Sequence, residues 1–181
     1  KPAGGYVLHV DYPVGTGPSA VVTTQINGDG VDDLVVANAG TSDISVLMGI
    51  TNGTFMAETR LALAANAAPL CVATGDLNAD TFTDIVSADT GIGSVSVMLG
   101  AGTGTFSPPV RYLVGDIPRW VILADLDNDT QPDIVTANRN TNNLSVLYNQ
   151  GGGAFAPAVS LNTGTNPRMV AALDLNGDTR L

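Results

Sequence analysis

Acidic and amide side chains are concentrated in four short windows of the sequence, and their spacing carries the clearest chemistry. The windows read QINGDGVDD from Gln25, DLNADTFTD from Asp76, DLDNDTQPD from Asp125 and DLNGDTRL from Asp174. Counted from the first residue of each window, positions 1, 3, 5 and 9 carry a carboxylate or an amide almost throughout. Calcium takes six to eight oxygen ligands from such groups, so the spacing predicts a loop that curls around an ion.

The second and third windows offer the fullest sets of oxygen ligands, with a backbone carbonyl expected at position 7 and a closing carboxylate at position 9. Carboxylates this close together repel one another unless a cation lies among them. Magnesium fits less well, because it requires tighter octahedral geometry and keeps several waters. Two strong calcium sites are therefore expected, formed by Asp76, Asn78, Asp80, Phe82 and Asp84, and by Asp125, Asp127, Asp129, Gln131 and Asp133.

The first and fourth windows offer fewer ligands. The first has Gln25 in place of aspartate and therefore one carboxylate fewer, so weaker binding is expected there. The fourth window stops before its closing carboxylate and is incomplete. The ligands expected in the first window are Asn27, Asp29, Val31 through its carbonyl, and Asp33, and those in the fourth are Asp174, Asn176 and Asp178.

Position 6 of the windows differs between the first and the others. It is Gly30 in the first window but Thr81, Thr130 and Thr179 in the rest. Glycine relieves the sharp bend of comparable calcium loops, so threonine predicts strain or lower affinity. The alternative to metal binding is that the windows are hairpin turns rich in Asp, Asn and Gly, which favour turns without any ion.

The windows belong to a repeat of about 50 residues. A proline precedes each window, a valine follows that proline, and an aromatic residue recurs near the end of each unit. The landmarks are Pro18, Pro69, Pro118 and Pro167; Val21, Val72, Val121 and Val170; and Tyr6, Phe55, Phe106 and Phe155. The units run approximately over residues 1–11, 12–60, 61–111, 112–160 and 161–181, and the first and last are partial.

Each whole unit has the β-branched, alternating character of four short strands separated by turn residues. In the third unit these strands are expected at 120–126, 133–138, 144–148 and 155–161, and the fourth unit adds a first strand from Met169. Four antiparallel strands at this period predict a β-propeller blade. The chain is expected to be all-β, a single propeller segment over 1–181 with three whole blades and two partial ones. Missing blades or other copies of the chain would complete the ring.

Composition excludes several classes of function. The net charge is −10 with seven Lys and Arg, which cannot form the basic surface that nucleic acid requires. No apolar run approaches the roughly 20 residues that span a bilayer, so membrane insertion is not expected. Cys71 is the only cysteine, which excludes an internal disulfide and is interpreted as a core residue. His9 is the only histidine, and no motif places a nucleophile and base together, so no enzyme activity is expected.

Three further residues have two open interpretations. Trp120 either stacks on a sugar ring or packs in the core or the channel of the ring. Arg119 and Arg168 each follow a repeat proline, and they either pair with an acidic ligand or are solvated.

The stretch GTGPSAVVTTQINGDGVDDLVVANAGTSDISVLMGITNGTF, from Gly15 to Phe55, and its counterparts ending at Phe106 and Phe155 resemble FG-GAP/VCBS-type repeats. Such blades also form the head of integrin α chains, and the resemblance covers essentially the whole chain. It implies calcium in the acidic hairpin loops and an extracellular or envelope-exposed protein. The leading hypothesis is a non-enzymatic, calcium-binding module for adhesion or for binding a protein or glycan at a ring face. The alternatives are the propeller part of a secreted polysaccharide hydrolase or lyase, and a structural spacer.

Overall fold

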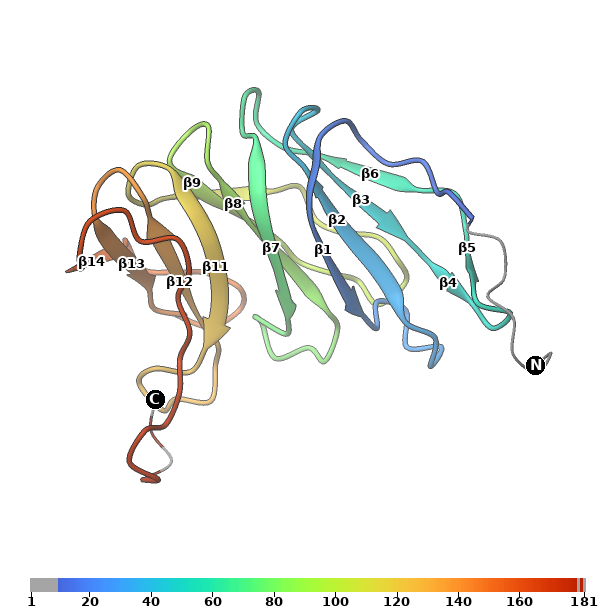
Figure 1. Cartoon of the computed structure of the whole chain (residues 1–181). Coiled ribbons are helices and arrows are strands. Elements are labelled where there is room, and N and C mark those ends of the chain that lie inside the picture. Colours follow the sequence, from blue (N-terminus) through green and yellow to red (C-terminus); the bar gives the residue numbers. More distant parts are fainter. Residues whose placement is uncertain (1–9, 179, 181) are drawn as a thin grey trace, which may run out of the picture.

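The computed structural model describes residues 10–178 and residue 180. Those residues form β-strands and turns with no helix, and hence no helix long and apolar enough to cross a membrane. Three four-stranded antiparallel sheets follow one another along the chain and fan out side by side in an open arc (Figure 1). The prediction of an all-β chain built from propeller blades is confirmed. The first partial unit lies outside the described residues except for Val10 and Asp11, and so do Tyr6 and His9.

Each sheet takes its four strands in the order of the sequence. The first sheet contains β1 (Pro18–Thr24), β2 (Asp33–Asn38), β3 (Asp43–Leu47) and β6 (Thr59–Ala62). The second contains β7 (Pro69–Gly75), β8 (Asp84–Asp89), β9 (Ser94–Met98) and β10 (Val110–Leu113). The third contains β11 (Pro118–Ala124), β12 (Asp133–Asn138), β13 (Asn143–Leu147) and β14 (Val159–Asn162). A short pair, β4 (Gly49–Ile50) and β5 (Thr54–Phe55), extends the first sheet's hairpin.

The first strands of the three sheets, β1, β7 and β11, lie next to one another and run in the same direction (Figure 1). Each first strand has a register shift directly after its proline, as between Pro118 and Trp120. A shift is expected there because proline has no N–H for the ladder. The first three acidic windows follow the ends of these strands, so their loops project from the same edge of the arc (Figure 1).

The last strand of the third unit is shorter than predicted. A single strand over 155–161 was expected, but Phe155 forms only an isolated bridge with Asn149, and β14 begins at Val159. This prediction was wrong because the pairing shifts register between the bridge at Phe155 and the ladder that starts at Val159. The first sheet has the same break between Phe55 and Thr59, where there is no proline.

The first strand expected from Met169 does not form in the described residues. A first strand hydrogen-bonds to the second strand of its own unit, as β11 does to β12, and the described residues after the fourth window include no such partner. Residues 170–173 instead lie beside the third sheet, where they line a cavity of about 240 Å³ with residues of β11 to β14.

The apolar core joins neighbouring sheets. Val72 of β7 belongs to the same buried cluster as Val35 and Ile44 of the first sheet. A second cluster contains Cys71 of the second sheet together with Leu147 of the third. Cys71 is buried, which confirms its interpretation as a core residue. Because these clusters span the sheets, each blade depends on the next for its hydrophobic core.

The recurrent aromatic residue packs against a side chain that lies before the first strand of its own sheet. Tyr112 of β10 meets Phe155 edge to face, with ring centroids 5.5 Å apart. Tyr12 meets Phe55 in the same geometry at 5.3 Å. Between these pairs, Leu61 of β6 packs against the buried cluster that also contacts Phe106. The aromatic landmark of the repeat therefore serves as a contact between blades.

Replacement of Tyr112 by alanine is expected to lower the free energy of unfolding by about 2 to 3 kcal/mol, because Phe155, which is 6% exposed, loses its ring contact. Tyr112→Leu introduces the residue type found at Leu61 and is expected to cost less than about 1.5 kcal/mol. Urea unfolding of both variants measures the difference. Equal losses would show that the side chain's bulk at this position does not stabilise the blade contact.

Candidate functional site

Each of the first three acidic windows forms the hairpin loop between the first and second strands of a sheet, and its carboxylates turn towards the loop's own backbone. In the third loop Asp125 accepts hydrogen bonds from the N–H of Asp129 at 3.2 Å and of Thr130 at 2.9 Å. Asp129 accepts one from the N–H of Gln131 at 2.8 Å. The second loop repeats this pattern. These bonds orient the side chains at positions 1 and 5 before any ion binds.

The loops contain residues with left-handed backbone conformation. Thr81 has φ 72° and Thr130 has φ 73°, at the position where the first loop has Gly30 with φ 81°. A β-branched residue is strained in this region, whereas glycine adopts it freely. The strain predicted for threonine at position 6 is therefore present.

The carboxylate at position 9 is buried and tied to two turns. Asp133 is 0% exposed, and its Oδ2 accepts the N–H of Leu126 at 3.0 Å while its Oδ1 accepts the N–H of Asn149 at 2.9 Å. Burial raises the pKa of Asp133, these backbone hydrogen bonds lower it, and the carboxylates of Asp127 and Asp129 raise it again. A cation between these carboxylates would relieve their mutual repulsion.

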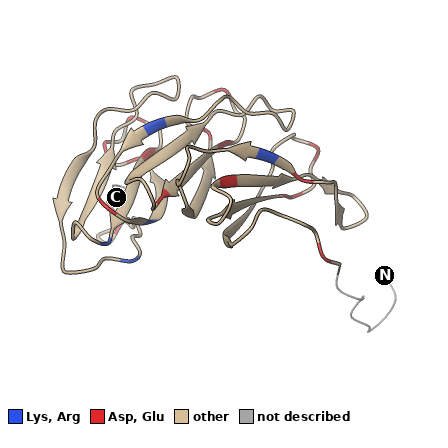
Figure 2. Cartoon of the chain, turned by 90° about the horizontal axis from the view of Figure 1, so that it is seen from above, with Lys and Arg blue, Asp and Glu red and all other residues tan. Residues whose placement is uncertain are grey.

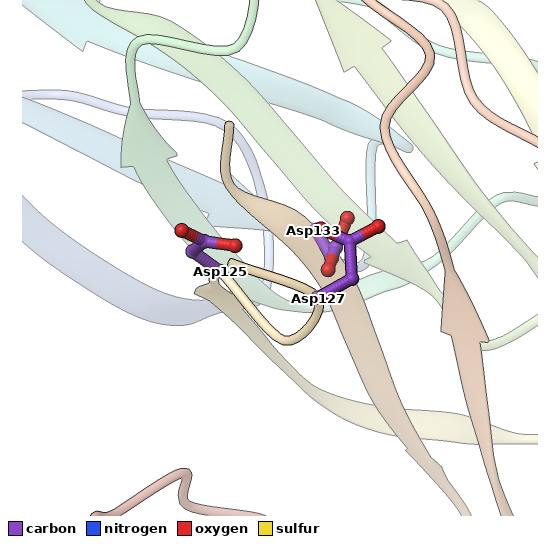
Figure 3. A group of neighbouring side chains, drawn as sticks. All are labelled: Asp125, Asp127 and Asp133. Carbon is purple, nitrogen blue, oxygen red and sulfur yellow. The ribbon is translucent and has the colours of Figure 1, made fainter. Parts of the chain in front are cut away.

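The third loop brings three carboxylates together. Oxygen atoms of Asp125, Asp127 and Asp133 all lie within 4.8 Å of one another, the one such acidic group among the described residues (Figure 3). An all-oxygen set of this kind fits calcium. The second loop has Asn78 at the position of Asp127. The amide of Asn78 donates to Asp80 at 2.8 Å, where a carboxylate would repel it. Of the two sites predicted as strong, the third loop thus concentrates more negative charge.

The first loop forms the same turn as the others, although its first position is the neutral Gln25 instead of an aspartate. The side-chain oxygen of Gln25 accepts the N–H of Gly30 at 3.1 Å, the bond that Asp125 makes in the third loop. The amide nitrogen of Gln25 donates to Asp32 at 3.1 Å. Asp32 is at position 8 of the window and is not among the ligands expected from the sequence. Gln25 therefore preserves the loop's shape without adding a charge for an ion.

The fourth loop has the same local turns. Asp174 accepts the N–H groups of Asn176 at 3.1 Å and Gly177 at 2.7 Å, and Asn176 donates to Asp178 at 3.0 Å. Its position 6, Thr179, lies outside the described residues. Asn176 and Asp178 thus pair with each other as Asn78 and Asp80 do in the second loop.

The two arginines and the tryptophan with open interpretations lie together. Arg119, Trp120 and Arg168 line a cavity of about 270 Å³ near the start of the first strands. Trp120 is half-buried and packs against the core cluster of the second and third sheets. This packing favours the core interpretation of Trp120.

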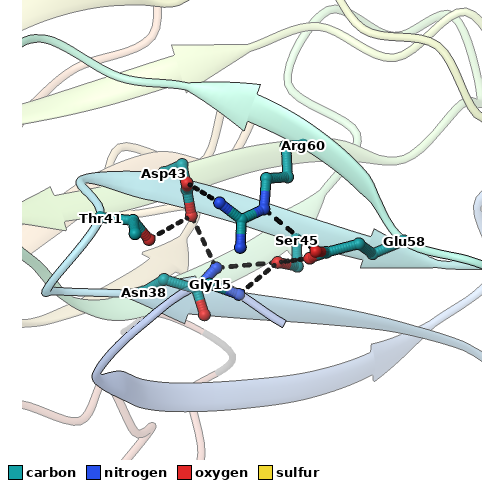
Figure 4. A network of polar contacts seen from close by, with 7 residues as sticks. All are labelled: Gly15, Asn38, Thr41, Asp43, Ser45, Glu58 and Arg60. Atoms are coloured by element: carbon teal, nitrogen blue, oxygen red, sulfur yellow. Dashed lines mark hydrogen bonds and ion pairs between the residues drawn. The ribbon is translucent and has the colours of Figure 1, made fainter. Parts of the chain in front are cut away.

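A buried polar layer between the strands escaped the sequence analysis. In the first sheet Ser45 donates to Glu58 at 2.5 Å, and Arg60 bonds to Glu58 at 3.1 Å and to Asp43 at 3.2 Å (Figure 4). Asn38 donates to both Asp43 and Ser45. The signal that would have revealed this layer is the recurrent Asn or Asp at the end of each second strand, followed by a recurrent serine in each third strand.

The second sheet builds the same layer around a different acid. Asp89 accepts hydrogen bonds from Ser96 at 2.5 Å and from Ser87 at 2.7 Å. Burial raises the pKa of Asp89 to about 6, although these hydroxyl groups and the charge of Arg111 lower it. Basic side chains are sparse over the whole chain, so few charges oppose such acids (Figure 2).

Blades with an acidic hairpin loop after the first strand define the chain as a β-propeller assembled from repeats. The pattern of the FG-GAP-like repeat matches residues 25–87, 76–136 and 125–181. The chain therefore belongs to the FG-GAP-like repeat family. No curated protein sequence matches it.

Solved β-propellers share this fold. A putative 6-phosphogluconolactonase from Bacteroides fragilis superposes with a TM-score of 0.66 at 18% identity, covering 88% of this chain and 43% of that one. A lectin of Agrocybe aegerita, with specific recognition of non-reducing terminal N-acetylglucosamine, gives 0.59 at 21% identity over 80% and 38%. Virginiamycin B lyase from Staphylococcus aureus gives 0.57 at 12% identity over 83% and 43%. The chain spans less than half of each protein, and these identities support the fold alone.

Replacement of Thr130 by glycine is expected to raise the free energy of unfolding by about 1 kcal/mol, because it removes left-handed strain that exceeds glycine's entropic cost. Gly30→Thr provides the matched control and is expected to lower it by a similar amount. No heavy atom lies within 4 Å of a Cβ built at Gly30, so only the backbone conformation is tested there. Chemical denaturation measures the free energy of unfolding of both variants. A lower value for Thr130→Gly than for the wild type would show that Thr130 is not strained.

Asp89→Asn is expected to stabilise the protein at neutral pH by up to about 2 to 3 kcal/mol, the equivalent of two pKa units. Because folding raises this pKa from 3.8 to about 6, the wild type loses stability as the pH rises through that range. Asn138 of the third sheet shows that the amide fits, since it accepts from Thr136 at 2.9 Å and donates to Ser145 at 2.8 Å.

Unfolding free energies of wild type and Asp89→Asn between pH 4 and pH 8 measure this effect. The difference should be small at pH 4 and level off above about pH 7. A difference in unfolding free energy that is the same at every pH would mean that folding does not raise the pKa of Asp89.

Proposed function

We propose that this chain is a calcium-binding, non-enzymatic propeller module of an exported protein, which mediates adhesion or binds a protein or glycan at a ring face. The observation that carries the calcium part is the convergence of Asp125, Asp127 and Asp133 within 4.8 Å. Sites of modest affinity fill where calcium is near millimolar, as it is outside cells. Membership of the FG-GAP-like repeat family, typical of extracellular proteins, supports the location.

Asp125, Asp127, Asp129 and Asp133 would hold the ion in the third loop, together with the carbonyl of Gln131. The positive charge of a bound ion would offset the negative charges of these carboxylates. By linking position 9, which starts β12, to the loop that follows β11, the ion would stiffen the hairpin at one end of the blade. The stiffened loops would then present a ring face of defined shape to a ligand.

The recurrence of the acidic loop supports a binding module over an enzyme. An active site occurs once in a protein, whereas these carboxylates recur after the first strand of every sheet. The lectin among the solved structures with this fold supports a glycan as one class of ligand.

Calcium titration of chelator-treated protein by calorimetry tests the proposal, with thermal melts alongside. Binding at two or more sites is expected, together with a melting temperature that rises with calcium. A ligand at 100 times its dissociation constant stabilises the folded state by about 2.7 kcal/mol. Absence of both binding heat and a melting shift would overturn the calcium part of the proposal.

Asp127→Asn provides a matched variant, because asparagine is the residue at this position in the other three loops. The Oδ1 of Asn78 accepts the N–H of Asp80 at 3.1 Å, so the amide preserves the turn. We expect about tenfold weaker binding at the third loop, since the ligand charge falls by one, with an unchanged or higher melting temperature in chelator. Unchanged calcium affinity would show that the charge of Asp127 does not contribute to calcium binding.

A further inference from the structure

A cavity of about 580 Å³ lies between the second and third sheets. The segment 111–115, which includes the end of β10, forms one wall, and residues of β13 and β14 form the other. Its polar lining comes from Thr141, Asn143, Ser145 and Ser160, beside apolar groups such as Leu113 and Ala158. The cavity therefore combines hydrogen-bonding groups with apolar surface.

Ser145 presents an unused hydrogen-bond donor to this cavity. Its side chain is 1% exposed, and its oxygen accepts the N–H of Gly115 at 3.2 Å and the amide of Asn138 at 2.8 Å. A hydroxyl that accepts two hydrogen bonds has only its own hydrogen left to donate. No acceptor for that hydrogen is found among the described residues, and a buried donor without a partner costs free energy.

The first sheet shows which group belongs there. Ser45 occupies the same repeat position as Ser145 and accepts the same two bonds, from Gly15 and Asn38. Its own hydroxyl donates to the carboxylate of Glu58 at 2.5 Å (Figure 4). In the second sheet the corresponding Ser96 also donates to a carboxylate, that of Asp89. Two of three sheets thus give this serine an acidic partner from the chain itself.

The third sheet lacks that partner and leaves its space open. Ala158 stands at the repeat position of Glu58, and Ser160 at that of Arg60. Ser160 is exposed and accepts the amide of Asn143 at 3.2 Å, and its hydroxyl donates to no acceptor among the described residues. Two small residues therefore replace the two long ones, and two hydroxyl donors line the space.

We propose that this cavity binds an acidic sugar residue of the uronic acid class, whose carboxylate accepts hydrogen bonds from Ser145 and Ser160 in place of Glu58. The mixed lining fits a sugar ring, which has hydroxylated edges and apolar C–H faces. Arg111 is the basic residue of the lining, although it shares its charge with Asp89. The proposal deepens the glycan part of the proposed function and rests on it.

Binding of glucuronic and galacturonic acid, compared with glucose and galactose, tests the inference by ligand-observed NMR and calorimetry in calcium buffer. The uronic acids are expected to bind at least tenfold more tightly than the neutral sugars. Equal binding of neutral and acidic sugars would overturn the role of the carboxylate, and no binding of either would overturn the site. Equal or tighter binding of a short aspartate-rich peptide would replace the sugar by a peptide as the ligand class.

Two variants separate this cavity from the rest of the surface. Ser145→Ala removes the buried donor and is expected to weaken uronic acid binding at least tenfold. The double variant Ala158→Glu with Ser160→Arg rebuilds the first sheet's network inside the cavity and should abolish binding with an unchanged or higher melting temperature. Binding that survives the double variant would place the sugar elsewhere, for example on calcium in the loops.

The calcium titration on the same preparation distinguishes the two proposals. Lost uronic acid binding with intact calcium binding overturns only the cavity. Uronic acid binding without any calcium binding overturns only the calcium part of the proposed function.

Discussion

The buried carboxylate that closes each acidic loop is the interaction on which the blades depend. Asp33, Asp84 and Asp133 are fully buried, and each accepts one N–H from its own loop and one from the turn after the third strand. A buried charge is costly unless hydrogen bonds compensate for lost water. Each acid therefore holds two turns at fixed positions, and the same group stands beside the candidate calcium ligands.

This constraint connects the fold to its candidate chemistry. The second strand begins at the closing carboxylate, so the position of the acidic loop is set by the ladder between the first and second strands. In the third loop burial raises the pKa of the closing carboxylate, and the nearby acids raise it further. An ion at this place would stabilise the loop and the strand start together.

Differences between sheets carry more functional information than their common features. The backbone repeats closely, and the serine of the third strand recurs as Ser45, Ser96 and Ser145. Its acidic partner is the residue just before the last strand in the first sheet and a residue of the second strand in the second sheet, and the third sheet provides neither. Because the scaffold is constant, a missing partner points to a place where something outside the chain can bind.

The sequence by itself determined the blade pattern and the shape of the acidic loops. Hydrogen bonds in those loops join residues two to five positions apart, so the spacing of Asp and Asn is sufficient to predict them. Tertiary structure alone decided the contact of Tyr112 with Phe155, the bond from Asn149 to the carbonyl of Leu77 at 2.9 Å, and the open space beside Ser145. These features depend on how separate sheets pack, and the spacing of the repeat by itself does not say which side chains meet across sheets.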